Sequence, residues 1–326
     1  MKKGIKTALI CASLLFISGV SVLSATTCAA GWDFKNFDAN DFEKNVHEVG
    51  QAFSNISIEM DTADVVLAPS ADGKCKVDCY EEKKAKHSVS VQGDTLEIRL
   101  DNQKVWYDYI ELFNFNAPRI TVYLPQTEYA ALTVNGATGD VEIAEEFAFD
   151  SISVEMSTGD VKNYASAKNL MKIKTSTGDI GVENVSANAL DLTVSTGSVT
   201  LSNASVAGDL SLSVSTGKSR LTNVDCKNFT SEGGTGKIIL KNVIASEKFF
   251  IERDTGDIEL EGIDAAEISI KTSTGDVEGW VLSEKVFIPK SSTGDIDVPK
   301  TVNGGRCEIT TSTGDIEISI GEDAED

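Results

Sequence analysis

The sequence predicts an all-β protein, a parallel β-helix or β-solenoid with about 19–20 residues per coil and irregular capping coils at its N-terminal end. Two observations predict this fold. A Thr-Gly pair recurs ten times over the last two thirds of the 326 residues, and apolar residues alternate with polar ones on both sides of each pair. A constant period without helical spacing is typical of stacked coils, in which each coil covers only its neighbours.

The Thr-Gly pairs are expected to form the same tight corner in every coil. The spacing between successive glycines takes only two values, which differ by one residue; these glycines are Gly139, Gly159, Gly178, Gly197, Gly217, Gly236, Gly256, Gly275, Gly294 and Gly314. Glycine adopts a positive φ angle at little cost. Ser, Thr and Asp beside it can bond to neighbouring backbone groups. These glycines are therefore interpreted as structural turn residues.

Two strands are expected in each coil, because apolar residues recur at every second position. In the coil that begins at Gly256 they are Ile258, Leu260, Ile263, Ile268 and Ile270. Parallel strands of successive coils lie about 4.8 Å apart, so ten coils make a rod of about 48 Å. Parallel crossovers favour a right-handed coil. A one-residue bulge at the second corner explains why the length of the coils alternates.

The first 30 residues are interpreted as a signal peptide or signal-anchor. Lys2, Lys3 and Lys6 precede an apolar run from residue 8 to 25, and cleavage after Ala30 is favoured. An uncleaved anchor is the alternative, since about 18 residues are near the lower limit for spanning a bilayer. Lipidation at Cys28 is disfavoured by the residues before it. The folded part is expected to be extracytoplasmic, either secreted or tethered to the cell membrane by its N-terminus.

The remainder of the chain is divided into four segments. They are a polar spacer (31–52), an irregular N-terminal β cap (53–137), the regular β-solenoid repeats (138–320) and an acidic tail (321–326). From Asn55 on, residues 56–66 reproduce the pattern of residues 152–161 with alanine in place of glycine, so they are interpreted as a degenerate first coil. Larger, irregular coils are expected to close the open edge of the stack.

The net charge of −22 becomes −25 when the three lysines of the signal region are removed. This acidity argues against nucleic acid and against anionic lipid as partners, and it favours a monomer. Cys75 and Cys79 both point inward about 13 Å apart on one strand, too far for a disulfide, and are interpreted as core residues. His47 and His87 are isolated in the sequence, so neither a metal-ligand pattern nor a cofactor is predicted.

An acidic residue follows most of the repeat glycines and forms a predicted column on one face. Its members are Asp140, Asp160, Asp179, Asp257, Asp276, Asp295 and Asp315. Calcium between stacked carboxylates could relieve their repulsion. The alternative is corner chemistry alone, because Ser198, Lys218 and Lys237 interrupt the column. The structural interpretation is preferred, with a Ca²⁺ ladder as the sharper hypothesis.

An aromatic cluster in the longest insertion of the cap is a candidate ligand-binding site. It comprises Trp106, Tyr107, Tyr109, Phe113 and Phe115. Aromatic side chains of an exported protein can stack on sugars or grip a partner. They also fill the core beneath long loops, which is the alternative here.

Repeats of Ser-Thr-Gly-Asp-[Val/Ile] on alternating strands, behind an N-terminal apolar segment, resemble the bacterial putative adhesin family, which carries a domain of unknown function built of β-strand repeats. The resemblance covers roughly residues 53–320. It implies an adhesin-like binding or surface-display module of the cell envelope without catalytic residues. Its partner would be an unknown cell-surface glycan or protein. Envelope-stress sensing or scaffolding is the alternative that the resemblance leaves open.

Two other classes of protein are disfavoured. Polysaccharide lyases and hydrolases also use parallel β-helices, but their acids are paired with Arg, Lys or a metal on long loops. Here the corners are short, and the repeats contain only Arg220, Arg253 and Arg306 as arginines. The chain is therefore not expected to be an enzyme. A self-associating rod is opposed by the charge.

Overall fold

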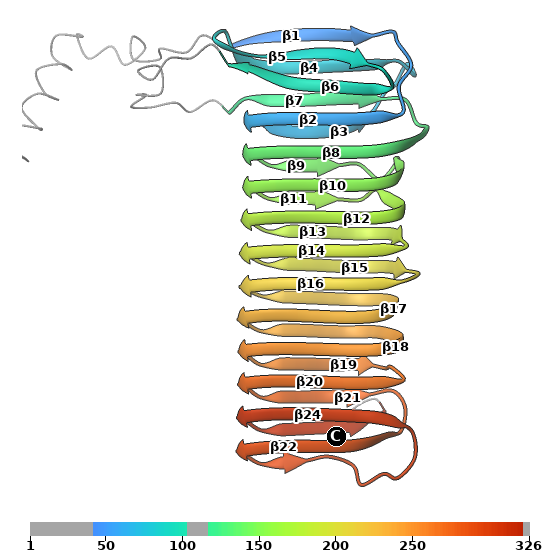
Figure 1. Ribbon diagram of the computed structural model, residues 1–326, viewed down its shortest axis with the longest axis vertical. Helices are drawn as coiled ribbons and strands as arrows, with labels where there is room; N and C mark the ends of the chain where they lie inside the picture. Colours follow the sequence, from blue (N-terminus) through green and yellow to red (C-terminus); the bar gives the residue numbers. More distant parts are fainter. Residues whose placement is uncertain (1–41, 103–116, 322–326) are drawn as a thin grey trace, which may run out of the picture.

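The computed structural model describes residues 42–102 and 117–321, and within these ranges the chain forms 25 strands and no helix (Figure 1). In this described part, no helix is long and apolar enough to cross a membrane. Most strands are stacked in one column of parallel coils, and the remaining ones close the N-terminal end (Figure 1). The expected β-solenoid is thus confirmed.

Each coil has two strand-bearing faces. The face that leads into the Thr-Gly corner consists of β2 (Asn55–Thr62), β8 (Glu128–Thr138), β10 (Ala148–Thr158), β12 (Ser166–Thr177), β14 (Ala189–Thr196), β16 (Asp209–Thr216), β20 (Glu267–Thr274), β22 (Lys285–Thr293) and β24 (Gly305–Thr313). The face that follows the corner consists of β3 (Asp64–Pro69), β9 (Val141–Ile143), β11 (Val161–Asn163), β13 (Ile180–Ala187), β15 (Val199–Val206), β19 (Ile258–Ile263), β21 (Val277–Val281), β23 (Ile296–Asp297) and β25 (Ile316–Ile320).

Two long strands contribute to both faces, and five strands make up the cap. The long strands are β17 (Ser219–Thr235) and β18 (Ile238–Thr255). The cap strands are β1 (Phe42–Val49), β4 (Cys75–Glu82), β5 (Ala85–Gln92), β6 (Thr95–Asn102) and β7 (Arg119–Leu124). Strands β6 and β7 still pair in parallel with β2 and β3, whereas β1, β4 and β5 join the cap through antiparallel pairs.

The core is a set of apolar columns that run along the stack. Leu190 pairs with Leu210 and Leu192 with Leu212 in neighbouring coils, and all four side chains are buried. Alternation of buried and exposed positions holds on both faces, as the sequence predicts. The ten corner glycines have φ angles between 132° and 148°, a range that glycine adopts and other residues rarely do.

The second corner contains a ladder of asparagines that was not predicted from the sequence. Asn184, Asn203, Asn223 and Asn242 have φ angles of 52° to 57°. The side-chain amides of the last three each donate to the Oδ1 atom of the preceding asparagine at 2.9–3.0 Å. Asparagine is one of the few non-glycine residues that tolerate this left-handed region. Each ladder position lies six residues after a corner glycine, a spacing that is visible in the sequence.

Replacing Asn203 tests which property the second corner needs. We expect Asn203→Ala to destabilise the protein by about 1–2 kcal/mol more than Asn203→Gly, because alanine is strained in the left-handed region and glycine is not. Gly262 holds the equivalent position two coils beyond Asn223 with a φ of 71°. Thermal unfolding followed by circular dichroism measures the difference. Equal losses in the two variants would contradict this conformational explanation.

Both ends of the stack depart from sequence order. At the N-terminal end, the degenerate first coil (β2 and β3) pairs directly with β8 and β9 on one side and with β6 and β7 on the other. At the C-terminal end, β24 lies between β20 and β22, so the last coil of the chain is inserted before the preceding one (Figure 1). The expectation that every coil stacks on its sequence neighbour is therefore wrong at this end.

The two C-terminal coils differ in burial and in how well they suit the edge of the stack. In the inserted coil, Cys307, Ile309 and Ile316 are almost completely buried. In the coil at the end of the stack, Ile288 and Ile296 are 44% and 45% exposed. Strand β22 also contains Pro289, which has no amide hydrogen and suits an edge strand. The coil with proline thus forms the edge, and the other coil takes the interior place.

The N-terminal segments contain one strand that was not predicted. The expected polar spacer (31–52) includes β1, whose residues pair antiparallel with β4. Cys75, Cys79, Cys226 and Cys307 are buried and free, which agrees with the interpretation of Cys75 and Cys79 as core residues. The signal region (1–30), the predicted aromatic cluster (Trp106, Tyr107, Tyr109, Phe113 and Phe115) and most of the acidic tail (321–326) lie outside the described residues.

Candidate functional site at the N-terminal cap

A groove with a volume of about 1090 Å³ opens where the regular coils meet the cap. Its walls come from the segment after β1, the turn between β3 and β4, and the segment between β7 and β8. These segments are far apart in the sequence and are brought together because β4 pairs with both β1 and β7. The groove therefore depends on the irregular strands of the cap.

Aromatic and charged side chains line this groove. The ammonium group of Lys76 lies 4.4 Å from the ring centroid of Tyr123, its cross-strand partner. Tyr129 is buried, donates a hydrogen bond of 2.9 Å to the carbonyl oxygen of Pro125 and stacks on Phe53. Burial raises the pKa of Tyr129 to about 12, so this hydroxyl stays a donor. The lining combines fixed rings with a cation.

The turn that borders the groove is held by Asp72. Its carboxylate accepts hydrogen bonds from the Ser70 hydroxyl at 2.8 Å and from the Lys74 amide at 3.1 Å. These bonds lower the pKa of Asp72 and keep it ionised. Its role here is to fix the turn, since these bonds engage its carboxylate within the loop.

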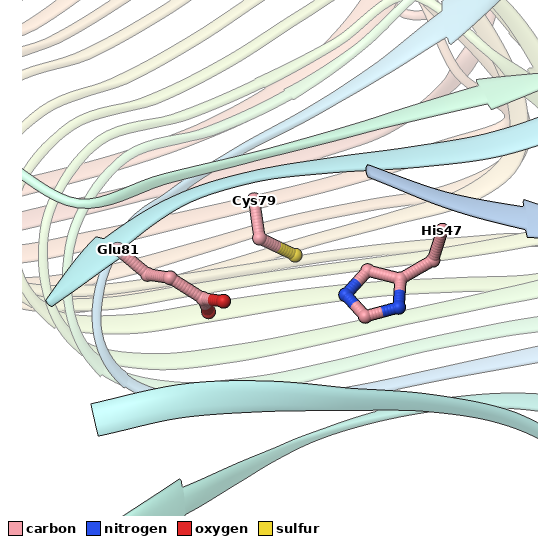
Figure 2. Close-up of side chains that lie close together, drawn as sticks. All are labelled: His47, Cys79 and Glu81. Carbon is pink, nitrogen blue, oxygen red and sulfur yellow. The ribbon is translucent and has the colours of Figure 1, made fainter. Parts of the chain in front are cut away.

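The only two histidines lie close together in the cap, contrary to their isolation in the sequence. His47 on β1 lies beside Cys79 and Glu81 on β4, and ligand atoms of these three side chains are within 4.8 Å of one another (Figure 2). His87 contacts the same carboxylate, with 2.7 Å between its Nδ1 and Oε2 of Glu81. Folding therefore creates a set of metal-ligating residue types that the linear spacing does not reveal.

The aspartate column forms a hydrogen-bonded ladder along the corners. The amide of Asp160 donates to Oδ1 of Asp140 at 2.8 Å, and the amide of Asp179 donates to Oδ1 of Asp160 at 2.8 Å. Equivalent bonds join Asp257, Asp276, Asp315 and Asp295 in their spatial order. Each bond stabilises a carboxylate without a cation. The aspartates thus have a structural role in linking the corners of successive coils, whereas calcium binding stays a prediction.

A search among curated proteins gave no match. Several solved structures are similar to the chain. A putative adhesin from Bacteroides fragilis is 14% identical, with 86% of this chain and 99% of that chain covered and a TM-score of 0.40. A putative lipid binding protein from Parabacteroides distasonis is 13% identical, with 85% and 97% covered and a TM-score of 0.49. A putative adhesin from the same species is 11% identical, with 86% and 98% covered and a TM-score of 0.47.

The family model described as Toastrack DUF4097 matches the chain twice, over residues 53–213 and 204–326. Together these matches span the degenerate first coil, the cap strands β4 to β7 and all the Thr-Gly coils. Because the matches cover most of the sequence, the chain belongs to the Toastrack DUF4097 family.

Proposed function

We propose that the chain is an exported, non-catalytic binding module of the bacterial cell surface, in which the regular coils form a stalk and the cap groove takes the ligand. The observation that carries this proposal is the groove itself, which lies at the N-terminal end of the regular coils, beside the cap. Concave sites with a few fixed polar groups among aromatic side chains are typical of ligand recognition. Export rests on the signal-like N-terminal sequence.

The regular coils are poorer candidates for recognition. Their corner polar groups are used within the stack, since the asparagine side chains and the aspartate carboxylates bond to neighbouring coils. Their corners are short and repeat with the same geometry. Such a surface offers length and rigidity, which a stalk needs.

A cell-surface glycan is the ligand class that the groove fits best. Tyr123 is half-buried and presents a ring whose partner is the charged end of Lys76. Ring faces stack on sugars, while ammonium and amide groups can bond to hydroxyl or carboxylate groups of the sugar. A protein partner is the alternative, and capture experiments separate the two.

Capture of cell-wall and glycan ligands by the full chain tests the site. We expect Tyr123→Ala to weaken binding by about 10–100-fold, as for loss of an aromatic anchor. Trp280→Ala is the matched control, because Trp280 lines a second groove of about 550 Å³ at the other end of the stack, together with several glutamates. That variant should bind as the unmodified chain does.

Three outcomes would contradict the proposal. Loss of binding in Trp280→Ala with full binding in Tyr123→Ala would move the site to the second groove. Loss only in Trp106→Ala would assign recognition to the predicted aromatic cluster. Capture of a surface protein, with no binding of any glycan, would show that the ligand is a protein and not a glycan.

A further inference from the structure

We propose that the cap binds a zinc ion through His47, Cys79 and Glu81, and that this ion fastens β1 to the rest of the cap. The three residue types are the nitrogen, sulfur and oxygen donors that Zn²⁺ uses in proteins. This inference is independent of the cap groove and of its ligand. It concerns a structural site.

Strand pairing explains why these side chains converge. In the antiparallel pair of β1 and β4, Asn45 lies opposite Cys79 and His47 lies opposite Val77. His47 is therefore the diagonal neighbour of Cys79, and Glu81 follows two residues later on the same face of β4. Figure 2 shows the Cys79 side chain between the Glu81 carboxylate and the His47 ring.

The spacing of the donor atoms is close to that of a zinc site. One ligand atom from each residue lies within 4.8 Å of the other two. Zinc bonds of about 2.0–2.3 Å place neighbouring ligand atoms of a tetrahedral site roughly 3.3–3.8 Å apart. Side-chain shifts of about 1 Å would close the set around an ion. A fourth position would be left for water.

A buried ring nitrogen without a hydrogen-bond partner lies at the same site. Among the described residues, Nε2 of His47 is buried without a hydrogen-bond partner, and so is Nε2 of His87. Buried polar atoms normally have partners, so an orphaned imidazole nitrogen beside a thiol needs an explanation. A cation at this point would supply the missing partner for His47.

The neighbours of Glu81 hold its carboxylate in place for a ligand role. Oε1 accepts a hydrogen bond from the Asn45 side-chain amide at 2.7 Å, and Oε2 accepts one from the His87 backbone amide at 2.6 Å. The His87 ring also lies 2.7 Å from Oε2 through its Nδ1 atom. Such outer contacts orient metal ligands.

Charge balance also favours a divalent cation. Cys79 is completely buried, where an uncompensated charge would be costly. When Zn²⁺ binds, the sulfur forms a bond to zinc and the thiol proton passes to solvent. One thiolate and one carboxylate then neutralise the ion, which is what a buried site requires. No oxidation or reduction is involved.

The location gives the ion a structural task. Strand β1 pairs with β4 alone among the described strands and lies at the end of the molecule (Figure 1). A single two-stranded contact is a weak attachment for a terminal strand. Zinc bound by one residue of β1 and two of β4 would cross-link the pair.

Metal titration of the full chain tests the site. The protein is freed of metal with EDTA and titrated with Zn²⁺, and Co²⁺ serves as a spectroscopic probe for thiolate ligation. We expect one equivalent of Zn²⁺ per chain, a thiolate-to-cobalt charge-transfer band, and a higher melting temperature with zinc. Cys79→Ser and His47→Gln should each weaken binding by at least about 100-fold, since outer partners alone are worth about 10–100-fold.

Cys75→Ser is the matched control, because Cys75 is a buried cysteine of the same strand outside the cluster. It should keep the stoichiometry and the cobalt band. Absence of stoichiometric zinc in the unmodified chain would overturn the proposal. Zinc binding that survives in Cys79→Ser would overturn it as well, because the ion would then lie elsewhere. If Cys79→Ser does not fold, His47→Gln decides by the same criteria.

Discussion

Gly197→Ala is expected to lower the free energy of unfolding by about 3–5 kcal/mol, one of the largest effects available to a single substitution in this chain. Gly197 has a φ of 144°, a conformation that alanine rarely adopts. A Cβ atom there would overlap the carbonyl oxygen of Gly178 in the preceding coil. Neither backbone can move away without displacing the coils stacked beyond it.

Gly181→Ala is the matched control for this prediction. Gly181 lies within β13 of the preceding coil. The nearest heavy atom that a Cβ would meet there is the Val161 carbonyl oxygen at 4.0 Å, and its φ is not in the left-handed region. We expect no loss of stability, or a gain of about 0.5–1 kcal/mol. Urea unfolding followed by circular dichroism compares the two variants. Midpoints that fall equally would contradict the corner argument.

The first coil shows when alanine can replace this glycine. Ala63 stands at the corner position there and is not among the residues with positive φ. Its amide still donates to the Thr138 carbonyl oxygen of the next coil at 3.0 Å. The neighbour on its other side is Pro118, whose carbonyl oxygen accepts from the amide of Asp64. Without a preceding glycine corner, the close approach disappears and alanine is tolerated.

The regular part of the fold could be predicted because the sequence of each coil specifies both its corner and its strands. The Thr-Gly corner and the alternation of residues such as Leu190 and Leu192 are local patterns, and stacking repeats them. The order of the coils at the C-terminal end is not local, because it depends on which coil packs on which. Pro289 was a usable signal, since proline within a strand indicates an edge.

The sequence indicated where a site in the cap would lie, but not which residues would form it. The failure of the period between residues 69 and 124 indicated where the surface becomes irregular, and the groove lies beside that segment. The convergence of His47 with Cys79 requires the antiparallel pairing of β1 with β4, two strands that β2 and β3 separate in the sequence. Nothing in the spacing of those residues specifies this pairing, so sequence reasoning treated the histidines as isolated.

The second large effect concerns Arg253, a charged side chain in the core of the stack. It is 1% exposed, and its guanidinium donates to Ser219 Oγ at 3.3 Å, Ser231 Oγ at 3.0 Å and the Val214 carbonyl oxygen at 3.3 Å. Space for it comes from Gly233, where a Cβ would overlap Nη1 of Arg253. Within the described residues, no salt bridge neutralises this charge, and Nε has no partner.

Two substitutions of Arg253 distinguish the contribution of its volume to stability from the cost of burying its charge. Burial lowers the pKa of Arg253 to about 10, so the charged form is disfavoured in the folded state relative to water. Arg253→Met keeps the volume and removes the charge, and we expect it to be at least as stable as the unmodified chain. Arg253→Ala leaves a cavity beside Gly233 and should be about 2–5 kcal/mol less stable than Arg253→Met. Urea unfolding at neutral pH ranks the three proteins; an Arg253→Met variant as unstable as Arg253→Ala would mean that the three hydrogen bonds, and not the volume, hold these coils together.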